Sequence, residues 1–181
     1  MENKLKIAND KHKTKYIFFW GNHSNKPYIT KACLSQWWAC AFNINGVTYN
    51  TAEQYMMAQK ALLFGDKETF NEIMTACTPN EFKALGRKVK NFNQDIWDAN
   101  KESIVYEGNY AKFSQNNELR QYLLETGNLI LVEASPYDTI WGIGMSQDDP
   151  NILDESKWRG LNLLGKTLMK VRMSLAEEKF K

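Results

Sequence analysis

The stretch NTAEQYMMAQKALLF, residues 50–64, marks the point where the chain changes from a strand-like pattern to a helical one. Just before it, FNINGVTYN (42–50) alternates around the pair Asn45-Gly46, which favours a tight β-hairpin. From Thr51 onward, apolar residues recur at helical spacing. The sequence therefore predicts strands and loops in the front third and helices in most of the remainder.

Two charged residues share the apolar side of this predicted helix. Glu53 and Lys60 are seven positions apart, so their directions around the helix axis differ by only about 20°. Met56, Met57 and Phe64 fall on the same side. An acid and a base on an apolar stripe require an explanation.

Glu53 has a structural and a functional interpretation. As N3 of a helix capped by Asn50 it would complete a capping box, although Thr51 with Gln54 fits the same motif. Held among apolar side chains, its carboxylate would instead lose hydration, which raises the pKa and suits acid–base chemistry. For Lys60, either a buried ion pair or contact with a substrate above the stripe is compatible with the pattern.

Composition favours one domain. The chain has 181 residues, of which 43% are hydrophobic and 13% aromatic, enough for a core of ordinary size and for a ring-lined pocket. Residues 1–31 hold seven lysines against Glu2 and Asp10. We expect residues 1–15 to form a basic, partly flexible leader, either simply solvated or able to approach polyanions, and residues 16–181 to form a single domain.

Cysteine and histidine usage argues against a zinc site. Cys33, Cys40 and Cys77 are odd in number and lack CxxC spacing, which suggests a reduced, cytoplasmic protein. The two histidines, His12 and His23, both lie near the start of the chain. We therefore predict no metal site and no cofactor, although acidic side chains leave a carboxylate-bound magnesium open.

Further elements follow from local signals. KYIFFW (15–20) and NLILVEA (128–134) predict short apolar strands, and residues 135–160 form a long run without periodicity. The helical pattern continues up to residue 77, and we expect further helices at 79–89, 94–113, 116–127 and 161–180. Pro79 opens the first of these four, and Gly127 closes the third. The fold class is therefore α+β, mostly α-helical with a small sheet.

A second group of candidates occupies EASPYDTIWGIG, residues 133–144. Here a buried strand would deliver Glu133 and Asp138 into a loop, and ligand sites collect at such strand ends. Asp138 is the better candidate, although it could simply cap a turn. Gly142 beside Trp141 would let a ligand or another backbone approach the ring.

Two further residues have alternative roles. Trp97 falls on an apolar helical face, where core packing is the more common role and a stacking platform the alternative. Arg87 could neutralise a phosphate or cap a helix. Complete GxxxxGK[ST] or GxGxxG phosphate loops are absent from the sequence.

Seven motifs in one order resemble the NADAR family, which is named for NAD and ADP-ribose and is also called YbiA-like. They are YNTAEQYMMAQKALLFGD, ALGRKVKNF, IW, AKFSQN, LLETG, LVEASPYDTIWGIG and WRGLNLLGKTLMKVR. The resemblance covers the chain from about Phe18 to Leu175. It implies a YbiA-like fold and N-glycosidase chemistry on a ribosyl-linked nitrogen.

The resemblance also implies site roles. Glu53 corresponds to the catalytic glutamate, Lys60 to a helical lysine that could attack an opened sugar, and Asp138 to an acid that orients water or a ribose hydroxyl. Trp97 and Trp141 would form stacking walls.

The remaining implied contacts concern substrate binding. Gly142 would lie beside the substrate, and Arg87 would receive a phosphate. One departure concerns the front loop, where the family often has a Ser-Asn pair and this chain has Ser35 followed by Gln36. The longer reach of Gln36 puts a ribose or phosphate contact at this position in question.

Two substrates fit this resemblance. The chain would remove ADP-ribose from guanine in nucleic acid or nucleosides, or it would cleave phosphoribosylamino-pyrimidine intermediates of riboflavin biosynthesis. An alternative of another class is a module that binds ADP-ribose or NAD without turnover. The expected partner is thus a nucleotide-like molecule or ADP-ribosylated nucleic acid, with no membrane, and the sequence leaves the oligomeric state open.

Overall fold

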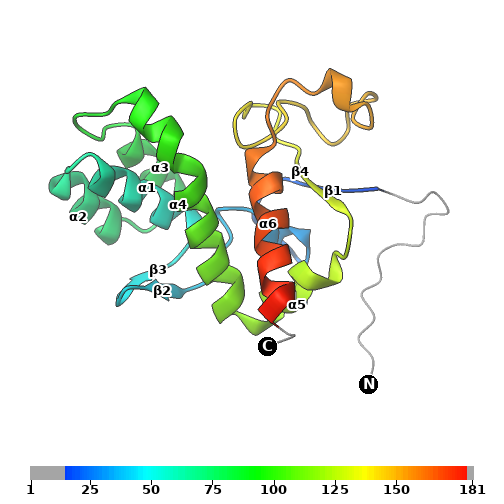
Figure 1. The fold of residues 1–181 in the computed structure, drawn as a ribbon, viewed down its shortest axis with the longest axis horizontal. Coiled ribbons are helices and arrows are strands. Elements are labelled where there is room, and N and C mark those ends of the chain that lie inside the picture. Colours follow the sequence, from blue (N-terminus) through cyan, green and yellow to red (C-terminus); the bar gives the residue numbers. More distant parts are fainter. Residues whose placement is uncertain (1–14, 179–181) are drawn as a thin grey trace.

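The computed structural model describes residues 15–178, in which helices form two groups on either side of one long helix (Figure 1). The helices are α1 (Ala52–Leu63), α2 (Lys67–Thr75), α3 (Pro79–Gly86), α4 (Gln94–Gln115), α5 (Asn117–Glu125) and α6 (Leu163–Glu177). The strands are β1 (Tyr16–Phe19), β2 (Phe42–Ile44), β3 (Val47–Tyr49) and β4 (Ile130–Glu133). Two 3-10 turns, η1 (Lys31–Leu34) and η2 (Glu155–Lys157), complete the described elements.

Helix α4 joins the two groups. On one side it packs against α1, which in turn contacts α2 and α3. On the other side it packs against α5 and α6, and α6 covers β4 (Figure 1). The predicted fold class is confirmed: the protein is mainly helical with little sheet.

The predicted sheet consists of two separate pairs of strands. The hairpin predicted at Asn45-Gly46 joins β2 and β3, and both turn residues have positive φ angles, 52° and 82°, as a tight turn of this kind requires. Strands β1 and β4 pair in parallel, with Phe19 opposite Glu133. This second pairing brings the end of β1 next to the loop that follows β4.

Local signals explain most helix ends. Thr78 caps α3 in a capping box with Glu81, and Pro79 occupies the first turn as predicted. Gly127, with φ 55°, follows the end of α5, as expected of a C′ glycine.

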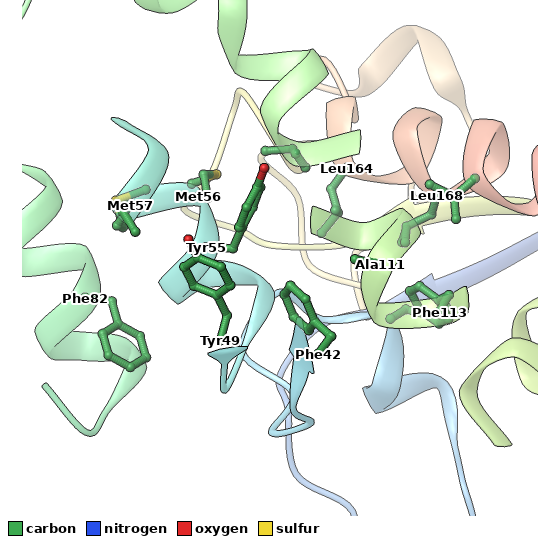
Figure 2. Close-up of a cluster of buried hydrophobic side chains, with 14 of the residues drawn as sticks. Phe42, Tyr49, Tyr55, Met56, Met57, Phe82, Ala111, Phe113, Leu164 and Leu168 are labelled. Carbon is green, nitrogen blue, oxygen red and sulfur yellow. The ribbon is translucent and has the colours of Figure 1, made fainter. Parts of the chain in front are cut away.

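A cluster of aromatic rings fixes α1 against the hairpin and α4. Figure 2 shows Phe42, Tyr49 and Tyr55 gathered beneath α4, and the ring centroids of Tyr49 and Tyr55 are 5.0 Å apart. A Cβ atom at Gly108 of α4 would lie 2.5 Å from the Tyr55 ring, so α4 approaches α1 closely at this glycine. The orientation of α1 is therefore set by packing along its length.

The long segment after β4 is ordered and tied back to the strand. Asn162, in a left-handed conformation with φ 53°, accepts a hydrogen bond from the Glu133 N–H at 3.0 Å and donates one to the Leu131 carbonyl at 2.9 Å. Its side chain thus replaces a neighbouring strand at the free edge of β4. The end of β4 and the loop that follows are held in one place.

Two predictions concern the chain as a whole. Of the predicted leader, residues 1–14 lie outside the described residues, so the division into leader and single domain stays a prediction. None of the helices within residues 15–178 is long and apolar enough to span a membrane.

Candidate functional site

The N-terminal turn of α1 leaves Glu53 free of capping. Thr51 is the N-cap, and its side chain accepts a hydrogen bond from the Gln54 N–H at 3.0 Å. Gln54 in turn accepts one from the Asn50 N–H at 2.8 Å. The predicted capping box of Asn50 and Glu53 is therefore wrong. Of the alternative box, the structure contains the predicted bond from the Gln54 N–H to the Thr51 side chain.

The Glu53 carboxyl group lies in a poorly hydrated environment. The residue is 5% exposed, and burial raises the pKa of its carboxyl to about 7, against the opposing effects of the Lys83 ammonium and the Trp37 side chain. The negative charge of Asp138 raises this pKa further. Near neutral pH the group can therefore both hold and release a proton.

Glu133 is a second acid near the first, half-buried as a residue. It ends β4, and its Oε2 atom is fully buried without a hydrogen-bond partner among the described residues. Burial raises the pKa of Glu133 to about 8, and the charges of Asp138 and Glu53 add to this effect while Lys83 opposes it. The Asp138 charge acts on both glutamates and Glu53 acts on Glu133, so the three carboxyl groups lie close to one another.

Asp138 shapes the loop that completes the cluster. Its Oδ1 atom accepts hydrogen bonds from the Ile140 and Trp141 N–H groups, at 2.9 and 2.7 Å. A Cβ atom at Gly142 would lie 2.9 Å from the carbonyl oxygens of both Asp138 and Glu133. The turn-capping interpretation of Asp138 is thus observed, and this tight turn brings Trp141 and Gly142 next to the acids. A role in substrate contact stays a prediction for all three.

Lys60 occupies a different environment from Glu53. Its ammonium donates a hydrogen bond to the Gly86 carbonyl at 2.8 Å and lies 4.3 Å from the ring centroid of Phe92 and 5.5 Å from that of Trp97. Burial lowers the pKa of Lys60. Within residues 15–178, Lys60 forms no ion pair with Glu53. Trp97 is buried as the packing interpretation predicts, with one face near the Lys60 ammonium.

Sequence reasoning did not identify the cation that acts on Glu53. This cation is Lys83 on α3, an exposed residue whose ammonium lies 6.0 Å from the ring centroid of Trp37. Arg87 follows at the C-cap of α3 and is exposed, as its capping interpretation predicts. No motif links Lys83 to Glu53, because the contact depends on how α3 packs against α1.

The predicted Ser35-Gln36 pair borders this site. The Gln36 carbonyl accepts the Glu53 N–H at 3.0 Å, and its side chain is buried, with Oε1 accepting a bond from Asn109 at 2.7 Å. The Ser35 hydroxyl accepts the Trp37 N–H at 3.2 Å. In this conformation both residues support the loop, and contact with a substrate stays a prediction.

Exposure differs among the three acids. Glu53 is 5% exposed, whereas Glu133 and Asp138 are half-buried. Two surface hollows, of about 460 and 520 Å³, lie around α5, and neither is lined by Glu53 or Glu133. Trp37, which is half-buried, acts on Glu53 from the loop before the hairpin.

Within residues 15–178, no three His, Cys, Asp or Glu side chains are grouped so that they could hold a metal ion.

Fold and site together define a mainly helical α+β protein with a cluster of carboxyl groups around the buried Glu53, the kind of site that suits acid–base chemistry. A family model described as the NADAR domain matches residues 18–176. The chain belongs to the NADAR family.

Several relatives of this chain are named N-glycosidases. One from Acanthamoeba polyphaga mimivirus is 51% identical over 163 residues, which cover 87% of this chain and 95% of the relative. N-glycosidase YbiA of Escherichia coli (strain K12) is 33% identical over 141 residues, covering 78% of this chain and 79% of the relative.

The fold is similar to that of a solved relative. The NMR structure of the E. coli protein YbiA matches with a TM-score of 0.77 and 28% identity, and the match covers 100% of this chain and 96% of the other. The predicted family and the predicted YbiA-like fold are therefore confirmed.

Proposed function

We propose that this chain is an N-glycosidase that hydrolyses a ribosyl C–N bond. The observation that carries the proposal is the Glu53 carboxyl, which is buried, free of helix capping and raised in pKa to about 7. Two relatives that cover most of this chain are named N-glycosidases, which supports the same reaction.

The acids suit the charges that this reaction creates. When the C–N bond breaks, positive charge develops on the anomeric carbon and the ring oxygen, and ionised Glu53 would stabilise it and take a proton from the attacking water. Glu133, with a pKa of about 8, stays largely protonated at neutral pH and would give its proton to the leaving nitrogen. The water oxygen thus joins the sugar, and Asp138 would orient that water or a ribose hydroxyl.

Lys60 offers an alternative first step. Burial lowers the pKa of its ammonium, which increases the share of the nucleophilic amine. In a ring-opened substrate C1 is joined to the base nitrogen as an imine; the amine would add to C1, the C–N bond to the base would break, and the base would leave with a proton. Water would then hydrolyse the imine formed on Lys60, releasing the sugar and the free amine. Such attack requires Lys60 to give up its bond to the Gly86 carbonyl.

For the substrate, we propose ADP-ribose linked to guanine, in nucleic acid or in a nucleoside. Lys83, Arg87 and Lys88 are exposed on α3 and directly after it, next to the acidic cluster through Lys83. Clustered cations attract the phosphates of a polyanion in a salt-dependent way. Trp97 and Trp141 would stack against the base or the sugar. The riboflavin-pathway intermediate is the second candidate, since a single phosphate could bind Arg87.

The cysteines support a proposal about the compartment. Cys33, Cys40 and Cys77 are all free, which fits a reducing compartment, and we propose that the protein acts in the cytoplasm.

A substrate panel tests the proposed reaction. Wild type and the Glu53→Gln variant are incubated with ADP-ribosyl-guanosine, ADP-ribosylated DNA and the riboflavin-pathway intermediate, and released base and sugar are detected by mass spectrometry. We expect release from at least one substrate by the wild type. In the variant, the rate should fall by on the order of 10²-fold or more. Glu72→Gln, an exposed glutamate on α2, serves as the matched control.

Two outcomes would overturn the proposal. One is equal turnover by wild type and Glu53→Gln. The other is binding of ADP-ribose in calorimetry together with an unaltered ligand mixture for all three glycosides, which would favour a binding module.

A further inference from the structure

Lys112 is a buried lysine that the proposed reaction does not use. It lies on α4 and is 0% exposed, and its ammonium donates a hydrogen bond to the Ser35 carbonyl at 2.7 Å. The same nitrogen lies 5.0 Å from the centroid of the Phe113 ring, and the titratable groups that face it are the thiols of Cys33 and Cys40. No carboxylate of the described residues forms an ion pair with it.

Burying a lysine without an acidic partner lowers the stability of a protein core. Moving an ammonium out of water without a carboxylate partner costs several kcal/mol in general, and an apolar side chain of similar volume usually stabilises a core better. Burial lowers the pKa of Lys112, yet both the ammonium and the neutral amine can donate to the Ser35 carbonyl. The feature that distinguishes Lys112 from a methionine at this position is that hydrogen bond.

Asn109, one turn earlier on the same face of α4, forms a hydrogen bond with Gln36, the residue after Ser35. It is also 0% exposed, and its Nδ2 atom donates to Gln36 Oε1 at 2.7 Å and to the Val105 carbonyl at 2.8 Å. Residues three apart on a helix lie side by side. Asn109 and Lys112 therefore hold two consecutive residues of the loop, Gln36 and Ser35.

The other side of this loop is bonded to the candidate catalytic residue. The Gln36 carbonyl accepts the Glu53 N–H at 3.0 Å, and the Ser35 hydroxyl accepts the Trp37 N–H at 3.2 Å. The Trp37 side chain lowers the pKa of the Glu53 carboxyl. A continuous set of contacts thus runs from α4, through the loop, to the start of α1.

From these contacts we propose that Asn109 and Lys112 are positioning residues that clamp the segment 35–37 against α1 and so set the environment of the Glu53 carboxyl. The proposal rests on the N-glycosidase function for its kinetic consequence. Its other consequence, a change in the titration midpoint of the Glu53 carboxyl, can be measured without any substrate.

The test replaces Lys112 by methionine. Lys112→Met keeps the length of the side chain and removes its donor, so the segment 35–37 loosens and the Trp37 effect on Glu53 is lost. We expect the titration midpoint of the Glu53 carboxyl, followed by carbon-13 NMR, to move to higher pH. With a substrate from the panel, kcat should fall by about 10- to 100-fold, because small misplacements of reacting groups have such effects. The groups that also face Glu53 (Lys83, Asp138 and Glu133) are unchanged.

Two further variants separate positioning from stability. Asn109→Leu removes the other half of the clamp and should shift the Glu53 midpoint in the same direction, which keeps the test valid if Lys112→Met fails to fold. Leu175→Ala, a core change in α6, should lower thermal stability and leave the midpoint unchanged. An unchanged midpoint in folded Lys112→Met or Asn109→Leu overturns the proposal. If the midpoint shifts in the variants but the wild type turns over none of the glycosides, the positioning role of Asn109 and Lys112 is supported and the N-glycosidase function is rejected.

Discussion

Replacing Glu53 by glutamine should stabilise the protein at alkaline pH and leave it nearly unchanged at acidic pH. The pKa of this carboxyl rises from 4.5 to about 7 on burial, so ionising it costs the folded protein about 3 kcal/mol more than the unfolded chain. Below pH 4.5 both states hold the proton and the cost is absent. As pH rises from 4.5 to 7 the wild type loses this stability, whereas Glu53→Gln does not.

Urea denaturation followed by circular dichroism at pH 4, 7 and 9 and constant ionic strength measures this effect. By linear extrapolation, the difference in unfolding free energy between variant and wild type should grow from near zero at pH 4 to about 3 kcal/mol at pH 9. Glu72→Gln, on the exposed face of α2, should differ little from wild type at every pH. Equal differences for Glu53→Gln at pH 4 and pH 9 would refute the inference that burial sets this pKa.

Three further predictions concern the charges and the packing around the site. The pH dependence of kcat/KM should be a narrow bell with limbs near pH 7 and 8, set by ionisation of Glu53 and loss of the Glu133 proton; a profile flat between pH 6 and 9 would contradict these roles. Lys83→Met removes a positive charge and should move both limbs of the profile to higher pH, whereas Asp138→Asn removes a negative charge and should move both to lower pH. Stopped assays across pH measure both shifts, and a shift of the opposite sign would contradict the prediction. Gly165→Ala should lower stability by about 1 to 3 kcal/mol in thermal melts, because its Cβ would lie 2.1 Å from the Leu131 carbonyl; a stabilised variant would show that helix propensity outweighs this contact.

Local signals were sufficient for most of the secondary structure. Asn45-Gly46 predicted the hairpin because few residues adopt two consecutive positive φ angles, and Pro79 and Gly127 marked helix ends for comparable reasons. The pairing of β1 with β4 joins segments more than a hundred residues apart, and no local pattern encodes such a contact. The sequence therefore predicted one small sheet, whereas the structure has two separate pairs of strands.

The candidate site was predicted in part. The apolar stripe drew attention to Glu53, but two capping boxes fitted the sequence equally well, and the structure was needed to show that Thr51 and Gln54 form the caps. Lys60 was the expected cationic neighbour because it lies on the same helix face. In the structure, α3 packs against α1, so Lys83 of α3 is the cation near Glu53. Lys60 instead donates a hydrogen bond to the Gly86 carbonyl.

Glu133 illustrates a different limit of sequence reasoning. At the end of an apolar strand its side chain could have pointed to solvent or into the protein, and alternation along four residues does not decide between them. Its Oε2 atom is buried, and its main chain is held by long-range bonds to Ile143 and Asn162 that no local pattern encodes.

Direct titration of the Glu53 carboxyl tests the central claim, that this acid is poorly hydrated and poised near neutral pH. The carbon-13 resonance of its carboxyl group is identified by its loss in Glu53→Gln and followed from pH 3 to pH 10. We expect a midpoint near pH 7. A midpoint at or below the ordinary value of about 4.3 for a glutamate would contradict it.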